Sequence, residues 1–129
     1  MGVFLTPEFE AERRRLSITD NILCKTARKV FSGLKGNSLG KFTYKSRIAL
    51  PNVSERDGAR SIVFFNDGVH LYFFYLYAKS NLSKKKGKEI EDAEIDLFCS
   101  IAPDFIAMNE TMIKTLLEKK ELFEVNCNE

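Results

Sequence analysis

The sequence predicts an α+β domain in which helices cover a small antiparallel β-sheet. Three observations lead to this fold class. Residues 41–50 alternate between apolar and polar side chains, and two apolar runs at 59–66 and 69–78 flank an Asn-Asp-Gly turn. Apolar residues at helical spacing precede and follow these strands. The 129 residues, 44% of them hydrophobic, suffice for one core, so we expect a single domain over residues 1–129.

The first forty residues are expected to form a short strand and two helices. Residues 2–5 are apolar and end at Thr6-Pro7, which is a good start for a helix over about 7–16. A second helix begins behind Thr19, keeps apolar residues at helical spacing and ends at Gly36-Asn37. The opening of the chain therefore predicts a helical hairpin that covers the sheet.

Three strands are expected to follow the hairpin. The alternation in residues 41–50 is typical of a half-buried strand. Its outer face carries Lys41, Thr43, Lys45 and Arg47, and its inner face carries Phe42, Tyr44, Ile48 and Leu50. Residues 59–66 and 69–78 are apolar on both faces, which predicts buried strands joined by a tight turn.

The last third of the chain predicts two helices. Ser83 is a suitable N-cap for a helix that reaches about residue 106, with a bend near Pro103. Asn109 is a suitable N-cap for a short helix over about 110–120. The expected order of elements is therefore β-α-α-β-β-β-α-α.

Composition excludes several classes of protein and site. No apolar run approaches the length of a membrane span, and the N-terminus lacks the pattern of a signal peptide, so we expect a cytoplasmic protein. Three scattered cysteines, Cys24, Cys99 and Cys127, predict no disulfide framework and show no metal-ligand spacing. His70 is the one histidine and lies within a strand. We therefore expect no metal and no cofactor.

Charge is distributed unevenly along the chain. The formal net charge is +2, but residues 41–88 carry ten Lys and Arg against three acids. Residues 89–129 carry three Lys against eleven acids. A basic middle beside an acidic end indicates one surface that faces a polyanion and a separate surface of opposite sign.

The basic residues of the predicted strands are the candidate site. They are Lys45 and Arg47 on one strand face, Arg60 at the start of the central strand, and Lys79 at the end of the last strand, in line with Tyr75 and Tyr77. Strand ends that meet at one edge of a sheet would bring these groups together. For Arg60 the structural alternative is a buried salt bridge to Asp57 or Glu55.

A run of lysines lies at the expected N-terminus of the helix behind Ser83. It comprises Lys84, Lys85, Lys86 and Lys88. The helix dipole disfavours cations there, and a bound phosphate would offset this cost because helix amides and lysines would bind the same anion. A solubilising lysine cluster explains the run about equally well.

The motifs of the middle of the chain resemble the RelE/ParE superfamily of type II toxins, and most closely its HigB-like members. The resemblance is carried by the segments Tyr44-Lys-Ser-Arg-Ile-Ala-Leu-Pro51, Gly58-Ala-Arg60, the Phe-rich hairpin and Tyr77-Ala-Lys-Ser80. It extends from Phe9 to Val125, which includes the ending Lys-Glu-Leu-Phe-Glu-Val.

The resemblance implies a ribosome-dependent mRNA endonuclease that inhibits translation and needs no metal. In this family mechanism the 2′-hydroxyl of the message attacks its own 3′-phosphate, while Arg and Lys side chains stabilise the charged transition state. By motif position Arg60 would stabilise the phosphate and Lys79 would supply a second cation. The general base stays open between Tyr77, His70 and a lysine whose pKa neighbouring cations lower.

The resemblance also implies the remaining contacts and partners. By motif position Lys45 and Arg47 would position phosphates. Outside the family pattern, Arg56 in the loop and Lys84 and Lys85 at the expected helix start are candidates for further RNA contacts because of their charge. The implied partners are mRNA, the ribosome and a cognate antitoxin of the helix-turn-helix type, with no membrane involved.

Two departures from the family pattern support an alternative. The loop over residues 52–57 carries two acids where relatives have a Gly-rich basic loop, which leaves Arg56 as its one cation. Lys84-Lys85 stands where relatives often have Asn-Ile. The alternative is a non-enzymatic binder on the same fold, such as a gyrase inhibitor or an inactive prophage-derived relic.

Overall fold

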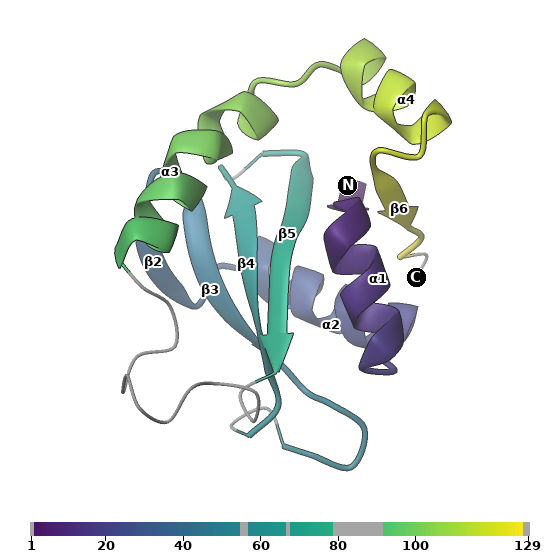
Figure 1. The fold of residues 1–129 in the computed structure, drawn as a ribbon, viewed down its shortest axis with the longest axis vertical. Helices are drawn as coiled ribbons and strands as arrows, with labels where there is room; N and C mark the ends of the chain where they lie inside the picture. Colours follow the sequence, from purple (N-terminus) through teal and green to yellow (C-terminus); the bar gives the residue numbers. More distant parts are fainter. Residues whose placement is uncertain (1, 55–56, 67, 79–91, 128–129) are drawn as a thin grey trace.

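A computed structural model describes residues 2–54, 57–66, 68–78 and 92–127, and it confirms the α+β class (Figure 1). Its strands are β1 (Gly2–Leu5), β2 (Asn37–Gly40), β3 (Thr43–Ile48), β4 (Ala59–Phe65), β5 (His70–Ala78) and β6 (Phe123–Val125). Its helices are α1 (Pro7–Arg15), α2 (Asp20–Phe31), α3 (Asp92–Ile106) and α4 (Glu110–Glu118). Within the described ranges, no helix combines the length and the apolar character needed to cross a membrane.

The six strands form one sheet in the order β2-β3-β4-β5-β1-β6. The pairs β2–β3, β3–β4 and β4–β5 are antiparallel, and so is β1–β6. The pair β1–β5 is parallel, so the sheet is mixed and the expectation of a wholly antiparallel sheet is wrong. The parallel pair arises because the N-terminal strand lies between β5 and the C-terminal strand β6.

Helices cover both faces of the sheet. On one face α1 and α2 enclose a core that includes Phe9, Leu23 and Val30, all fully buried. On the other face α3 and α4 pack over a second core that includes Phe98 and Ile113. Figure 1 shows α3 on the side of the sheet away from α2. The central strands are therefore buried on both faces, which explains their continuous apolar character.

Local sequence signals fix the starts of three helices. The side chains of Thr6, Thr19 and Asn109 accept hydrogen bonds from backbone N–H groups three residues onward, as their N-cap positions predict. The expected strand at 2–5 and the helices at 7–16 and 110–120 are thereby confirmed within a few residues. Residues 84–91 of the expected third helix lie outside the described part of the chain.

The expected N-terminal helical hairpin packed on the sheet is not matched as a separate unit. Helices and strands are interleaved along the chain, because β1 precedes α1 and lies between β5 and the edge strand β6. The strands β2 and β6 were both missed. They contain four and three residues, too few to show a period of two.

The expected strand over 41–50 is shorter and begins after a tight turn. Residue Phe42 has a positive φ of 53° between β2 and β3, so the alternation starts only at Thr43. Phe42 consequently packs against the α3 side, whereas Tyr44 and Ile48 face α2 as expected. Lys45 and Arg47 share the opposite face from Tyr44 and Ile48, which confirms the predicted basic face.

A one-residue bulge in β5 sets which of its side chains reach each face. Ile62 pairs with Tyr75 while the next residue Val63 pairs with Phe73, so Phe74 is the extra residue. Before the bulge Phe73 faces α1 and α2. Behind it Tyr75 shares the face of Ile62, which packs against α3. The bulge thus turns the C-terminal half of β5 by one position.

A disulfide joins α2 to the segment behind β6. Cys24 and Cys127 are bonded, and Cys99 remains a thiol. The expectation of no disulfide framework was wrong for this pair. The two residues are 103 positions apart, so their proximity follows from the tertiary packing of β6 beside α2 and leaves no trace in cysteine spacing.

We predict that Cys127→Ser destabilises the protein only under oxidising conditions. A crosslink across a 103-residue separation restricts the unfolded chain, and loop entropy gives a contribution on the order of 4–5 kcal/mol. Urea unfolding with and without a thiol reductant measures it, with Cys99→Ser as the matched control. If the urea midpoint of the wild-type protein is the same with and without the reductant, the prediction is wrong.

A second prediction concerns Gly36, which lies where the chain enters β2. It has a φ of +85°, and a Cβ atom there would lie 2.2 Å from the carbonyl oxygen of Lys45. Gly36→Ala should therefore lower the free energy of unfolding by more than about 1 kcal/mol. Gly33→Ala is the control, because Gly33 also has a positive φ but no atom within 4 Å of its Cβ position. Equal losses in both variants would contradict a clash at Gly36.

Candidate functional site

The first feature of the site is a row of three residues on adjacent strands. Arg47 of β3 pairs with Arg60 of β4, and Arg60 pairs with Tyr77 of β5. Directly paired residues of neighbouring strands point to the same face of a sheet. Arg47, Arg60 and Tyr77 therefore form one cross-strand row, which we call the arginine row. It lies on the face that α3 covers farther along the strands.

A second row lies beside the arginine row on the same face. Lys45 pairs with Ile62, and Ile62 pairs with Tyr75. On the outer side Asn37 of β2 pairs with Lys45. Two successive residues on one face of a strand are separated by about 6.6 Å, so Lys45 lies diagonally next to the arginine row. The two rows together bring three cations onto one surface.

Positive charge is concentrated on this face of β3 and β4. Like charges at directly paired positions destabilise a sheet, and Arg47 lies opposite Arg60. The strands β3, β4 and β5 contain no Asp or Glu that could alternate with these cations. Charged groups of this kind form strong hydrogen bonds to phosphate and carboxylate oxygens.

Arg60 differs from its neighbours because it is buried. Its exposed fraction is 4%, whereas Arg47 is exposed and Lys45 is half-buried. One guanidinium nitrogen of Arg60 donates a hydrogen bond to the carbonyl oxygen of Ala59 at 3.1 Å. A guanidinium remains charged when buried, and its field is screened less there than in water. Arg60 is therefore suited to stabilise negative charge that develops beside it.

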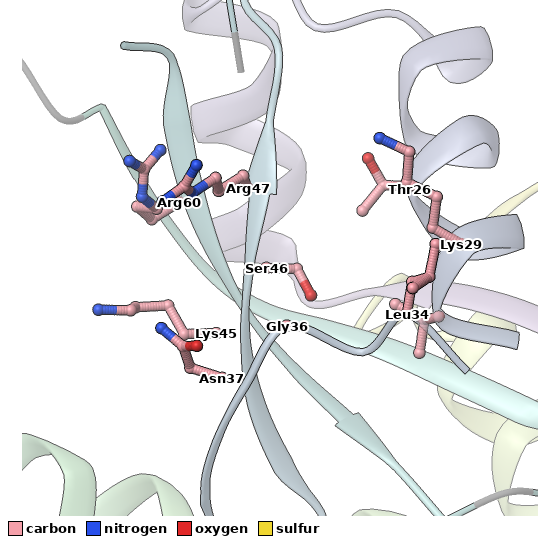
Figure 2. Close-up of a pocket in the computed structure, with 10 residues that line it drawn as sticks. Thr26, Lys29, Leu34, Gly36, Asn37, Lys45, Ser46, Arg47 and Arg60 are labelled. Carbon is pink, nitrogen blue, oxygen red and sulfur yellow. The ribbon is translucent and has the colours of Figure 1, made fainter. Parts of the chain in front are cut away.

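A pocket of about 630 Å³ gives access to these cations (Figure 2). It is lined by Thr26, Lys29, Val30, Leu34, Gly36, Asn37, Lys45, Ser46, Arg47 and Arg60. Figure 2 shows the side chains of Lys45, Arg47 and Arg60 on one side of β3, and those of Thr26 and Lys29 on the other. Four of these residues are basic and none is acidic. The pocket thus fits an anionic ligand.

The pocket lies where β3 loses its outer neighbour. The register of β2 with β3 ends at Asn37 and Lys45, and beyond this point β2 gives way to the chain that leads back to α2. Ser46 anchors that chain because its hydroxyl donates a hydrogen bond to the carbonyl oxygen of Lys35 at 2.9 Å. The gap beside β3 allows residues of both sheet faces to line one pocket.

A metal centre has no support in the described ranges. They contain no group of three or more His, Cys, Asp or Glu side chains that could hold a metal ion. The donor atoms that line the pocket are mainly the N–H groups of Lys and Arg, which bind anions such as phosphate.

Four of the residues predicted from sequence are brought together. Lys45, Arg47, Arg60 and Tyr77 lie on the two neighbouring rows. The other four predicted site residues, Arg56, Lys79, Lys84 and Lys85, lie outside the described residues. The same holds for the rest of the lysine run, Lys86 and Lys88.

The run Arg13 to Arg15 does not contribute to the site. Arg13 bridges Glu10 and Asp20, Arg14 also pairs with Glu10, and Arg15 pairs with Glu12. The pKa of the Glu12 carboxyl is lowered, mainly because Arg15 donates a hydrogen bond to it. These arginines are charges at the end of α1, where the helix dipole favours cations.

His70, one candidate for the general base, lies at the opposite end of β5. It starts the strand, about 20 Å from Tyr77 at the rise of an extended chain. Its Nε2 atom lies 2.6 Å from Glu110 Oε1. The neighbouring Tyr72 has a pKa raised to about 12, mainly because it is buried and to a lesser extent because Glu110 is negatively charged. His70 therefore lies too far away to act on a phosphate beside Arg60.

Four polar residues that line the pocket, Thr26, Lys29, Asn37 and Ser46, were not recognised from the sequence. Lys29 belongs to the last turn of α2, where a cation is expected for the helix dipole alone. Asn37 was interpreted as part of the end of a helix, and Thr26 and Ser46 were assigned no role in the site. Their role follows from the pairing of β2 with β3, which no local pattern of the sequence indicates.

Comparison with known proteins identifies the family. The chain matches over residues 1–125 the family profile described as RelE toxin of RelE / RelB toxin-antitoxin system. No curated protein and no solved structure shows a significant match. The matched range includes all strands of the sheet, the four described helices and the residues of both rows. The chain therefore belongs to the RelE toxin family, the toxin component of a toxin–antitoxin system.

Proposed function

We propose that this toxin is a ribosome-dependent mRNA endonuclease, of the HigB-like kind, that stops translation by cutting messages without a metal ion. The proposal rests on the pocket whose described lining residues include four cations and no acid, with Arg60 buried in it. A phosphodiester bears the charge that this pocket complements. Membership of a family of toxins adds a reason for the substrate to be RNA.

In the proposed reaction the RNA supplies its own nucleophile. The 2′-oxygen bonds to the adjacent phosphorus, the bond from phosphorus to the 5′-oxygen breaks, and a 2′,3′-cyclic phosphate and a 5′-hydroxyl result. A base accepts the proton of the 2′-hydroxyl, and an acid returns one to the leaving oxygen. The protein mainly has to align these atoms and stabilise the extra negative charge of the phosphorane.

The two rows divide these tasks. Arg60, buried and paired with both Arg47 and Tyr77, is suited to the phosphorane charge. Arg47 and Lys45, which are more accessible, would hold the phosphate in register. The hydroxyl of Tyr77 is our candidate for proton transfer, because it is the titratable group paired with Arg60 on β5.

The same proposal names the partners and the compartment. A cytoplasmic toxin that acts on ribosome-bound mRNA requires a cognate antitoxin, and we propose one of the helix-turn-helix type. Acidic segments of that antitoxin would suit the basic surface formed by the two rows.

The first test substitutes Arg60. Arg60→Ala should relieve growth arrest on induction and lower the cleavage rate by about 10²–10³-fold, the usual cost of removing a preorganised donor to a developing anion. Primer extension on a reporter message in a purified translation reaction measures the rate. An Arg60→Ala protein that is folded and still arrests growth would refute the proposal.

Two further variants control this test. Arg14→Ala removes an arginine that pairs with Glu10 on α1, so it should leave growth arrest intact. Arg60→Lys keeps the charge but loses the planar fork, and it should retain part of the activity. Far-ultraviolet circular dichroism shows whether each variant folds.

Loss of DNA integrity with intact mRNA would instead indicate a gyrase inhibitor, and absence of any growth defect would indicate an inactive relic.

The second test concerns the nucleophile and the proton. A message with a 2′-deoxy nucleotide at the cleavage position should resist the toxin, whereas the all-ribose message yields fragments with 5′-hydroxyl ends. Tyr77→Phe keeps the ring and removes the hydroxyl, so it should slow cleavage by about 10²-fold or more if this hydroxyl transfers a proton. Cleavage of the deoxy message at an unchanged rate would rule out attack by the 2′-oxygen.

A further inference from the structure

Tyr75 is the most exposed aromatic residue of the chain. All eleven Phe and four Tyr residues fall within the described ranges, and only Tyr75 is classed as exposed, with an exposed fraction of 38%. An exposed ring is unusual in a chain that uses its aromatic residues to build two cores. Its place beside the basic rows suggests a role on that surface.

The bulge at Phe74 is the reason why Tyr75 lies on this surface. With unbroken alternation from Phe73, positions 75 and 77 would face the core under α1 and α2. The extra residue brings Tyr75 and Tyr77 to the face of Ile62 and Arg60. Bulges often re-aim side chains beside functional sites, and this one turns two tyrosines toward three cations.

Neighbouring rings hold Tyr75 in place. The ring centroid of Tyr77 lies 5.8 Å away, and that of Phe98 on α3 lies 5.4 Å away. Both distances are in the range of favourable aromatic pairs. A ring supported in this way loses little conformational freedom when a ligand packs on it, so Tyr75 is preorganised for stacking.

We propose that Tyr75 is a stacking platform for an unpaired base of the RNA strand whose phosphate the basic rows bind, an inference that rests on the proposed function. Tyr75 and Lys45 both pair with Ile62, so they lie on either side of β4, about 10 Å apart. A short stretch of single-stranded RNA can place a phosphate at the cations and a base on the ring. Aromatic stacking accepts any base, so this contact adds affinity with little sequence preference.

The test measures binding of a short single-stranded RNA whose 2′-positions are O-methylated, so that it cannot be cut. Fluorescence anisotropy gives its dissociation constant for the purified protein. Tyr75→Leu should raise that constant by about 5- to 100-fold, while Tyr75→Phe, which keeps the ring, should stay within about twofold of wild type. Val69→Ala, an exposed apolar position before β5, is the matched control and should change nothing.

Salt dependence separates stacking from charge. Tyr75→Leu should leave the slope of log affinity against log salt unchanged, because it removes no cation. Lys45→Met should reduce the magnitude of that slope by about 0.7, the value expected for one phosphate contact on a single strand. A general loss of structure would not produce this difference in salt dependence between Tyr75→Leu and Lys45→Met.

Abasic RNAs complete the test. One abasic position should weaken binding to the wild-type protein as much as Tyr75→Leu does, and should cost the Tyr75→Leu protein nothing further. The proposal is overturned if the losses of affinity from Tyr75→Leu and from an abasic position add up at every position, or if Tyr75→Leu leaves the affinity unchanged. A protein partner would then be the ligand that packs on the ring of Tyr75. Absence of RNA binding by the wild-type protein would overturn the proposal as well.

Failure of this inference is distinguishable from failure of the proposed function. If Tyr75→Leu binds RNA like wild type but Arg60→Ala stops cleavage, the endonuclease proposal is supported and the stacking proposal is wrong. If Arg60→Ala still cuts, the proposed mechanism falls, whereas the abasic RNA comparison still decides whether Tyr75 stacks on a base.

Discussion

The register of the three central strands, interrupted once by the bulge in β5, determines where the charged side chains of this protein lie. It pairs Arg47 with Arg60 and Arg60 with Tyr77, and so concentrates charge on one face of the sheet. A shift of one residue in β4 would exchange the two faces of that strand and bury Arg60 among the aliphatic residues under α1 and α2. The two cores prevent such a shift, because each holds alternate residues of the same strands.

The fold tolerates a like-charged cluster because its stability comes from elsewhere. The central strands are buried on both faces, and the Cys24–Cys127 disulfide fixes α2 to the end of the chain. The pocket opens where β2 leaves β3, so cations of the sheet and Lys29 of α2 share one cavity.

The sequence allowed much of this fold and part of the site to be predicted, for reasons that particular residues illustrate. Thr6, Thr19 and Asn109 are strong local signals, and each begins a helix. Lys45 and Arg47 share a face because the period of a strand is two. The strand β6 and the disulfide at Cys127 were missed, because they depend on contacts between residues about a hundred positions apart. The bulge at Phe74 was also invisible, because Phe73 to Leu76 is apolar or aromatic throughout.

We propose that this RelE-family toxin uses the buried Arg60 and its neighbours on the sheet to cut ribosome-bound mRNA. Mapping of RNA 5′ ends across the transcriptome after brief induction tests it most directly. We expect new 5′-hydroxyl ends inside reading frames, at a fixed position relative to the ribosomal A site, and we expect them to disappear in the Arg60→Ala strain. Identical 5′ ends in the two strains, or growth arrest without any new ends, would contradict it.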